Sequence, residues 1–295
     1  MGTSTSNPGQ KGNTPLVPSW LDDVDGDGLL PSDPPAEPSP PQGQQPDQDS
    51  DSPQDPNQPG GRPETQEPDP RRFSTPRSNF TRFINSGGSG SGGRNLRRAI
   101  SSYVTHSSGG SHNATVRLGS ARRSTARLLS VVGGFASSGI QATAQKHNLG
   151  DIIGKPAQEA FLQIMDFVCP DGGQTDDGIA RSAYVEALAT IPDLETKQIE
   201  DLSSIEFLAF MEIFMTNVIV VKIENDIGNN IISLPDSISQ VNNLQEQLVD
   251  LIRGCVSDAF AKLGVDIAHI DTTQTQDIVD SVYKIAFDLT VGWED

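Results

Sequence analysis

Proline is distributed very unevenly along the chain, since sixteen of its 21 prolines lie within the first 70 residues. Each proline fixes its own φ and lacks a backbone N–H, so a segment this rich in proline supports neither helices nor sheets. From residue 22 to residue 70 the other residues are mostly small or polar, with few apolar side chains to bury. We expect residues 1–70 to be a disordered arm, partly in the polyproline II conformation.

Charge divides the chain at nearly the same place. Residues 1–70 hold 2 basic and 13 acidic residues, residues 71–147 hold 12 basic and no acidic ones, and residues 148–295 hold 7 basic and 26 acidic ones. The three net charges are −11, +12 and −19, against −18 for the whole chain. The basic segment therefore has acidic partners available within its own chain.

Apolar residues recur every three or four positions in the second half of the chain, which is the spacing of an amphipathic helix. A clear case follows Pro156, which suits a helix start, with Phe161, Ile164 and Val168 on one face. Similar patterns between capping and breaking residues predict helices over 113–132, 156–169, 175–191, 203–226, 236–263 and 272–289. The sequence shows no pattern typical of a strand pair or a hairpin.

These patterns predict an all-α fold with three parts. A helical domain, a bundle of five or six helices, occupies residues 113–295. A basic Gly/Ser/Arg-rich segment with one short helix, over 95–106, occupies residues 71–112, and the disordered acidic, proline-rich arm occupies residues 1–70.

Composition favours a cytoplasmic protein. Two cysteines, Cys169 and Cys255, are too few for a disulfide framework and fit a reducing compartment. The start MGTSTSNPGQKG lacks the apolar core of a signal peptide. The most apolar run, Phe207–Val221, is shorter than a bilayer span and carries Glu212 and Asn217, so it predicts a buried helix.

The arm contains one apolar island, TPLVPSW, at residues 14–20. Its candidate docking residues are Leu16, Val17, Pro18 and Trp20. The apolar side chains suit a groove on a partner, and the prolines reduce the entropy lost when the segment becomes ordered. The alternative is that the island folds back on the chain's own helices.

The N-terminal residues offer a reactive amine. Gly2 is small, so Met1 is expected to be removed, which leaves a free amine on a flexible arm. The start MGTSTS also matches the short myristoylation pattern. An unmodified terminus is the alternative.

The basic segment is rich in arginine, which suits bidentate contacts to phosphate or carboxylate. Its candidate patch consists of Arg94, Arg97, Arg98, Arg117, Arg122, Arg123 and Arg127. Nucleic-acid binding is one interpretation, although stacking aromatics are sparse and no known nucleic-acid module is present. Docking to the acidic body or to a partner protein is the other, and we favour it.

No set of residues indicates catalysis, and we expect neither a cofactor nor a metal site. His106, His112, His147 and His269 do not share a metal-ligand spacing, and no phosphate loop, nucleophile elbow or dinucleotide fingerprint occurs. The run Asp23–Gly28 copies the first half of an EF-hand loop, but Pro34 stands where the bidentate glutamate is required. Cys169 has no neighbouring cation in the sequence to activate it.

Several segments, in order along the chain, resemble the QatB family, an associated protein of bacterial Qat anti-phage defence systems. They are MGTSTSNPG with TPLVPSW, then NFTRFINSGGSGSGGRNLRRAISSYV, SARRSTARLLSVV, FVCPDGGQTDDGIARSAYVEAL and NDIGNNIISLPDSI. The resemblance covers nearly the whole chain apart from the rest of the arm. It implies a cytoplasmic, non-enzymatic defence component whose partners are a QueC-like protein, an ATPase and a TatD-like nuclease.

The resemblance also implies two functions. QueC-type enzymes activate a 7-deazaguanine carboxylate with ATP and attach a nitrogen nucleophile, and a relative could use a protein amine instead. Our first hypothesis is that the helical body docks to the QueC-like partner and presents Gly2 for modification, with residues 14–20 holding the arm in register. The second is a nucleic-acid adaptor, in which the Arg-rich segment 71–127 delivers phage nucleic acid to the TatD-like nuclease.

Overall fold

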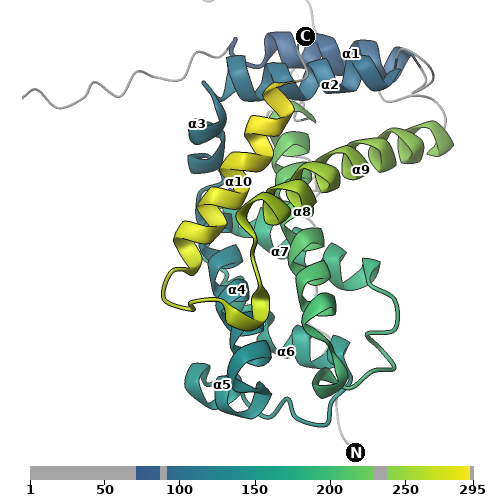
Figure 1. The fold of residues 1–295 in the computed structure, drawn as a ribbon. Helices are drawn as coiled ribbons and strands as arrows, with labels where there is room; N and C mark the ends of the chain where they lie inside the picture. The colour runs from purple at the N-terminus through teal and green to yellow at the C-terminus, as the bar shows by residue number, and fades with distance from the viewer. Residues whose placement is uncertain (1–70, 87–91, 229–237, 293–295) are drawn as a thin grey trace, which may run out of the picture. The chain divides into compact units, whose positions relative to one another are not determined.

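The computed structural model describes residues 71–86, 92–228 and 238–292 (Figure 1). Within these ranges every extended regular element is a helix, and the only β-type pairing is an isolated bridge between Pro156 and Gln198. The predicted all-α fold is confirmed. The α-helices are α1 (Ser74–Asn85), α2 (Gly92–Ser102), α3 (Ser111–Val116), α4 (Ser120–Ser138), α5 (Ile140–His147), α6 (Ala157–Val168), α7 (Thr175–Thr190), α8 (Ser204–Gly228), α9 (Ile238–Leu263) and α10 (Thr275–Val291). The expected arm, residues 1–70, lies outside the described residues.

The centre of the body is α8, on which α4, α7 and α9 all pack. Its apolar residues do not form a single stripe. Those that are buried lie on several sides of the helix: Phe207, Phe210, Met211, Phe214, Met215, Val218, Ile219, Val220, Ile223 and Ile227. A helix that is apolar on all sides needs neighbours on all sides, which the surrounding helices supply. The expected buried helix over Phe207–Val221 is therefore confirmed.

One described helix, α8, is long and apolar enough over Ser204–Ile227 to cross a membrane, judged by length and composition alone. In the structure, 56% of its most apolar window is buried inside the protein. A core helix of a folded domain meets the same length and composition test, and the packing of α8 against α4, α7 and α9 is of that kind.

Helix α1 was not among the predicted elements. It is followed at a short distance by α2, and the two pack on each other as a hairpin, with α2 also touching α10 (Figure 1). Phe80 and Phe83 of α1 and Leu96 and Ile100 of α2 belong to the same hydrophobic core as the helices of residues 113–295. The polar composition of residues 71–85 concealed this helix, because only one narrow face of it is apolar.

The segment 113–132, predicted as one helix, is two. Helix α3 ends at Val116 and α4 begins at Ser120. Between them Gly119 has φ 55°, in the left-handed region, and a Cβ there would overlap the carboxylate of Asp176. Only glycine meets both conditions at low cost. A further short helix, α5, follows Gly139, so residues 113–295 contain more helices than the five or six expected.

The later helices follow the predicted ranges closely. Helices α6, α7, α8, α9 and α10 each begin and end within a few residues of the expected positions. Helix α7 begins with a capping box formed by Gln174 and Asp177. Two 3-10 turns, η3 (Ile199–Asp201) and η4 (Ile267–His269), lie in the connections.

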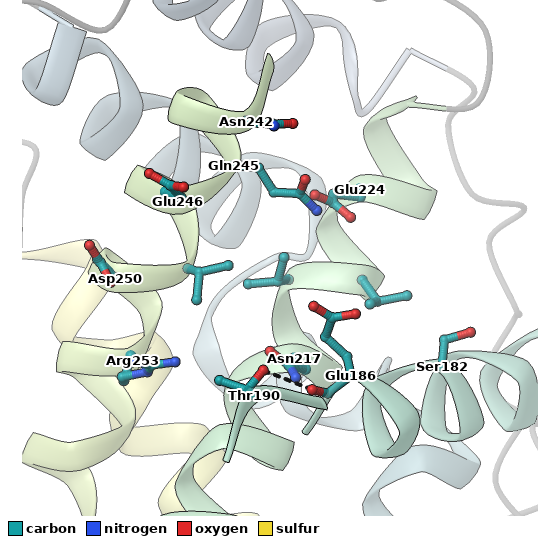
Figure 2. A pocket seen from close by; sticks show the side chains of 13 residues that line it. Ser182, Glu186, Thr190, Asn217, Glu224, Asn242, Gln245, Glu246, Asp250 and Arg253 are labelled. Atoms are coloured by element: carbon teal, nitrogen blue, oxygen red, sulfur yellow. Dashed lines mark hydrogen bonds between the residues drawn. The ribbon is translucent and has the colours of Figure 1, made fainter. Parts of the chain in front are cut away.

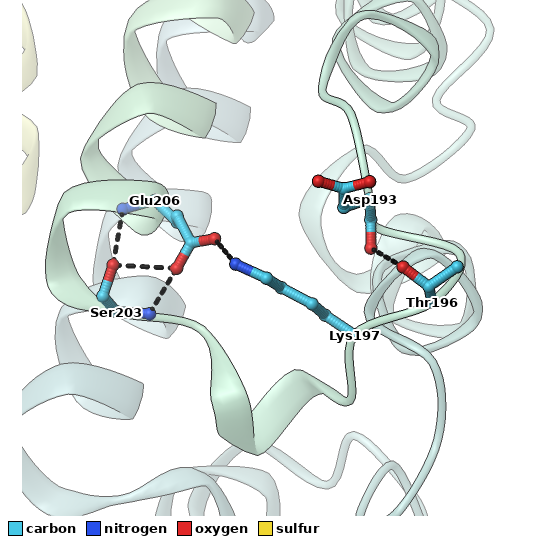
Figure 3. Close-up of polar contacts among 5 residues, drawn as sticks. All are labelled: Asp193, Thr196, Lys197, Ser203 and Glu206. Atoms are coloured by element: carbon cyan, nitrogen blue, oxygen red, sulfur yellow. Dashed lines mark hydrogen bonds and ion pairs between the residues drawn. The ribbon is translucent and has the colours of Figure 1, made fainter.

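The start of α8 is closed by a capping box that also holds the preceding loop (Figure 3). The Glu206 carboxylate accepts hydrogen bonds from the backbone N–H and the hydroxyl of Ser203, both at 2.8 Å, and the Ser203 hydroxyl accepts from the Glu206 N–H. Lys197 forms an ion pair with the same carboxylate. These contacts, with the Lys197 hydrogen bond foremost, lower the pKa of Glu206 to about 2.

We expect Glu206→Gln to lower the free energy of unfolding by about 1 kcal/mol at pH 7. The neutral amide can still cap the helix, but it loses the ion pair with Lys197 and the charge on its hydrogen bonds to Ser203. Urea unfolding at several pH values checks this. An ordinary glutamate has a pKa of 4.5 and folded Glu206 one of about 2, so the contribution is complete above pH 4.5 and is lost as pH falls toward 2. A difference between the two proteins that did not shrink over that interval would contradict the assignment to the carboxylate.

Candidate functional site: an arginine-rich helical hairpin

The candidate residues of the arm, Gly2, Leu16, Val17, Pro18 and Trp20, lie outside the described residues. Their roles stay predictions. The EF-hand-like run Asp23–Gly28 lies outside them too. The described part of the chain contains the seven arginines of the predicted patch, and it separates them into two groups.

The first group is on the outer face of α2. The side chains of Leu96, Ala99 and Ile100 are buried in the core on one side of this helix, so the residues on its opposite side face outward. Arg94, Arg97 and Arg98 are all exposed there. Neither Arg94 nor Arg98 forms an ion pair within the described ranges. The hairpin therefore presents positive charge to its surroundings.

The second group lies along the α3–α4 region, where two arginines are engaged within the protein. Arg122 forms an ion pair with Asp280 of α10 at 3.0 Å. Arg117 donates to the carbonyl oxygen of Ser107 at 2.7 Å. Arg123 is exposed and Arg127 is half-buried on α4. The seven arginines thus do not act as one patch, and Arg122 contacts the acidic body.

The base of the hairpin carries a charged network that the sequence did not point to. Tyr103 begins a single π-helical turn, η2 (Tyr103–Ser107), and its hydroxyl donates to Oδ2 of Asp226 at 2.8 Å. Lys222 lies 3.1 Å from Asp176 and 3.5 Å from Asp226. Burial, with Asp226 adding to it, raises the pKa of Tyr103 well above its usual range. Because its members lie far apart in sequence, only the fold reveals this network.

A second set of hydrogen bonds connects the residues just before α1 to the π-helical turn η2. The Ser107 hydroxyl donates to the carbonyl oxygen of Arg72 at 2.6 Å, and the carbonyl of Ser107 accepts from Arg117. The Arg72 guanidinium stacks on Phe73 at 4.7 Å from the ring centroid. Burial, and secondly the charge of Arg117, lower the pKa of Arg72. The hairpin is therefore held in a defined position on the body.

The potential nucleophiles of the body are in structural positions. Cys169 and Cys255 are buried, and burial raises the pKa of each thiol to about 12, so both remain protonated at neutral pH. The His147 ring packs at a tilt against Phe167, and burial lowers the pKa of His147. The exposed His269 contacts Asp266. Among the described residues no three His, Cys, Asp or Glu side chains are arranged to hold a metal ion.

We expect Tyr103→Phe to lower the free energy of unfolding by about 1–2 kcal/mol, because it removes a hydrogen bond to a charged, largely buried acceptor. Urea denaturation checks this. Arg98→Gln, a change on the exposed face of the same hairpin, is the matched control and should stay within about 0.5 kcal/mol of the unchanged chain. Equal stability of all three proteins would show that the network does not hold the hairpin.

A family model described as the Qat anti-phage system associated protein QatB matches residues 109–290. No curated protein and no solved structure matches the chain. The matched range begins just before α3 and ends near the end of α10, so it takes in the helical body described above. The resemblance seen in the sequence blocks is confirmed, and because the match covers more than half of the 295 residues, the chain belongs to the QatB family.

Proposed function

We propose that this chain is a non-enzymatic accessory and substrate protein of the Qat defence system. Its helical body docks to the QueC-like partner, and its arm presents the amine of Gly2 for modification. Membership of the QatB family makes the chain an accessory protein of the Qat anti-phage system. The observation that supports the finer proposal is that the thiols of the described body are buried and protonated, whereas the Gly2 amine belongs to a proline-rich arm.

The chemistry of the proposed step requires an unhindered amine. A QueC-type enzyme activates a carboxylate as its adenylate, and attack by an amine forms an amide, releases AMP and frees one proton. An α-amino group has a pKa of about 7.7–8.0, so a substantial fraction is neutral and nucleophilic near neutral pH. Glycine places no side chain next to that nitrogen. Both the partner and the chain would act in the cytoplasm, where ATP is available.

The proposal is tested by mass spectrometry of the N-terminal peptide, from chain produced with and without the QueC-like neighbour. We expect an added mass on Gly2 only when that neighbour is present. Gly2→Leu is the matched control, because a large second residue retains Met1 and removes the glycine amine. A bare Gly2 in both samples would overturn the proposal.

A second candidate function, the nucleic-acid adaptor for the TatD-like nuclease, is favoured by the exposed Arg94 and Arg98 of α2. It is weakened by Arg122, which the ion pair with Asp280 engages within the protein. Four arginines of the predicted patch, Arg94, Arg97, Arg98 and Arg123, are exposed. They supply few phosphate contacts, which suits weak and sequence-independent binding.

One binding experiment separates the two functions. We expect deletion of residues 2–20, or Trp20→Ala, to weaken co-purification of the QueC-like partner, because the apolar island of the arm adds to the docking of the helical body, with Trp293→Ala as the control. Binding to a duplex oligonucleotide would instead survive the deletion, fall steeply with added salt and weaken in Arg94→Gln with Arg98→Gln. Partner capture that is unchanged by the deletion would contradict docking through the arm.

A further inference from the structure

An apolar groove of about 510 Å³ lies on the body where the end of α4, the start of α5 and the start of α8 meet. The loop 148–156 before α6 and the loop 191–203 before α8 also contribute to it. Most of its lining residues are apolar: Phe135, Ala136, Gly139, Ile140, Ile153, Leu202 and Phe207. Phe135 and Phe207 belong to the hydrophobic core, and their ring centroids lie 5.8 Å apart. The groove therefore opens onto one edge of that core.

Two isoleucines at the groove are strongly exposed. Ile153 lines the groove and is 45% exposed. Ile205 directly follows the lining residues Ser203 and Ser204, and at 79% it is the most exposed large apolar side chain that the structure describes. Isoleucine is among the residues most often buried in proteins, and exposed apolar side chains grouped at a groove are typical of a binding surface.

The polar residues of the lining do not indicate a site for a small polar molecule. The Glu200 carboxylate accepts a hydrogen bond from the Gly154 N–H at 2.6 Å, and Ser203 is held in the capping box of α8 (Figure 3). A site for a small molecule has several polar groups directed at the ligand. The pocket between α7, α8 and α9 is more polar, but its lining mixes acidic side chains such as Glu224 with Arg253 (Figure 2). The groove instead suits the apolar side chains of another protein.

The two loops of the groove carry an excess of negative charge. Their exposed acidic residues are Asp151, Asp193, Glu195, Glu200 and Asp201. Their two lysines are already paired. Lys155 forms an ion pair with Glu159 of α6, and Lys197 forms one with Glu206 of α8. An apolar surface with an acidic rim favours a partner whose apolar side chains are flanked by lysine or arginine, and it disfavours an acidic one.

This charge argues against two occupants from the chain itself. The apolar island TPLVPSW is followed almost at once by Asp22 and Asp23, within an arm whose net charge is −11. The hairpin of a second copy has the required positive charge, but none of its described residues is a large exposed apolar side chain. A segment of a different protein, both apolar and basic, fits the groove better than either.

We propose that the groove is the docking surface of the helical body, and that it receives an amphipathic segment of a partner protein whose apolar side chains are flanked by lysine or arginine. The apolar side chains cover Ile153 and Ile205 and pack on Phe135, while the cations face the two acidic loops. Burial of apolar surface supplies the affinity, and the charges set the orientation and increase the association rate. The surface is inferred from the body alone, whereas its assignment to the QueC-like partner rests on the proposed function.

The first test uses two labelled peptides with the same amphipathic order, one of leucine and lysine and one of leucine and glutamate. Fluorescence anisotropy with the full chain measures their binding. We expect only the lysine peptide to bind, and Ile153→Ser with Ile205→Ser to weaken its binding by at least about tenfold. Leu162→Ser with Val185→Ser changes side chains that are 47% and 51% exposed outside the groove, and it is the matched control. Thermal unfolding verifies that each variant is folded.

A second pair of variants tests the acidic rim. Asp151→Lys with Asp201→Lys reverses two exposed charges of the loops, and we expect it to weaken binding of the lysine peptide several-fold and to reduce the dependence of binding on salt. Glu246→Lys with Asp250→Lys makes the same change at exposed positions of α9 and is its control. Equal weakening by both pairs would show that the peptide responds only to net charge, which contradicts docking in the groove.

Co-purification of the QueC-like partner with the same variants separates this inference from the proposed function. We expect the isoleucine variant to retain less partner than its control. Peptide binding in the groove, without co-purification of the partner by the unchanged chain, would contradict the proposed function and support the docking surface. Failure of the lysine peptide to bind, or equal results for the isoleucine variant and its control, would overturn the inference. Peptide binding that strengthens on deletion of residues 2–20, or an oligomer that the isoleucine variant dissociates, would also overturn it, because the arm or a second copy would then be the occupant.

Discussion

The position of Lys222 organises much of the body. Its ammonium group lies between Asp176 at the start of α7 and Asp226 near the end of α8, and its side chain is only 14% exposed. Removing one member of such a network leaves a poorly hydrated charge without compensation, which costs far more than the net value of the intact network. Tyr103 joins the hairpin to Asp226, and Gly119 admits Asp176 against the backbone between α3 and α4. The placement of four separate segments therefore depends on one lysine.

The sequence predicted the later helices well because each has a regular apolar face and a clear start or end. Two features were not predictable from local patterns. Helix α1 buries only Phe80 and Phe83 among its large side chains, so its pattern is weak and its order depends on packing against α2. The break at Gly119 is required by a carboxylate 57 positions away, and no local signal reports such a contact. Tertiary contacts therefore determine both the formation of α1 and the break at Gly119.

The residues of the candidate site were predictable from the sequence, but their arrangement in space was not. Counting charges located the basic segment, yet the exposure of Arg94 and the internal ion pair of Arg122 follow from which face of each helix meets the core. The apolar groove was beyond sequence analysis for a related reason. Ile153 and Ile205 each read as an ordinary apolar residue, and only the fold shows that both stay exposed beside the groove.

The opposite charges of hairpin and body have a consequence for docking. If all the arginines faced the acidic body, they would neutralise it and leave an outer surface with little electrostatic contrast. Instead Arg122 is paired internally, while Arg94 and Arg98 face outward beside a body of strongly negative charge. A surface with separated positive and negative regions orients an approaching partner and disfavours incorrect orientations, which contributes more to specificity and association rate than to affinity. Such a surface suits the proposed docking of this accessory protein to a partner.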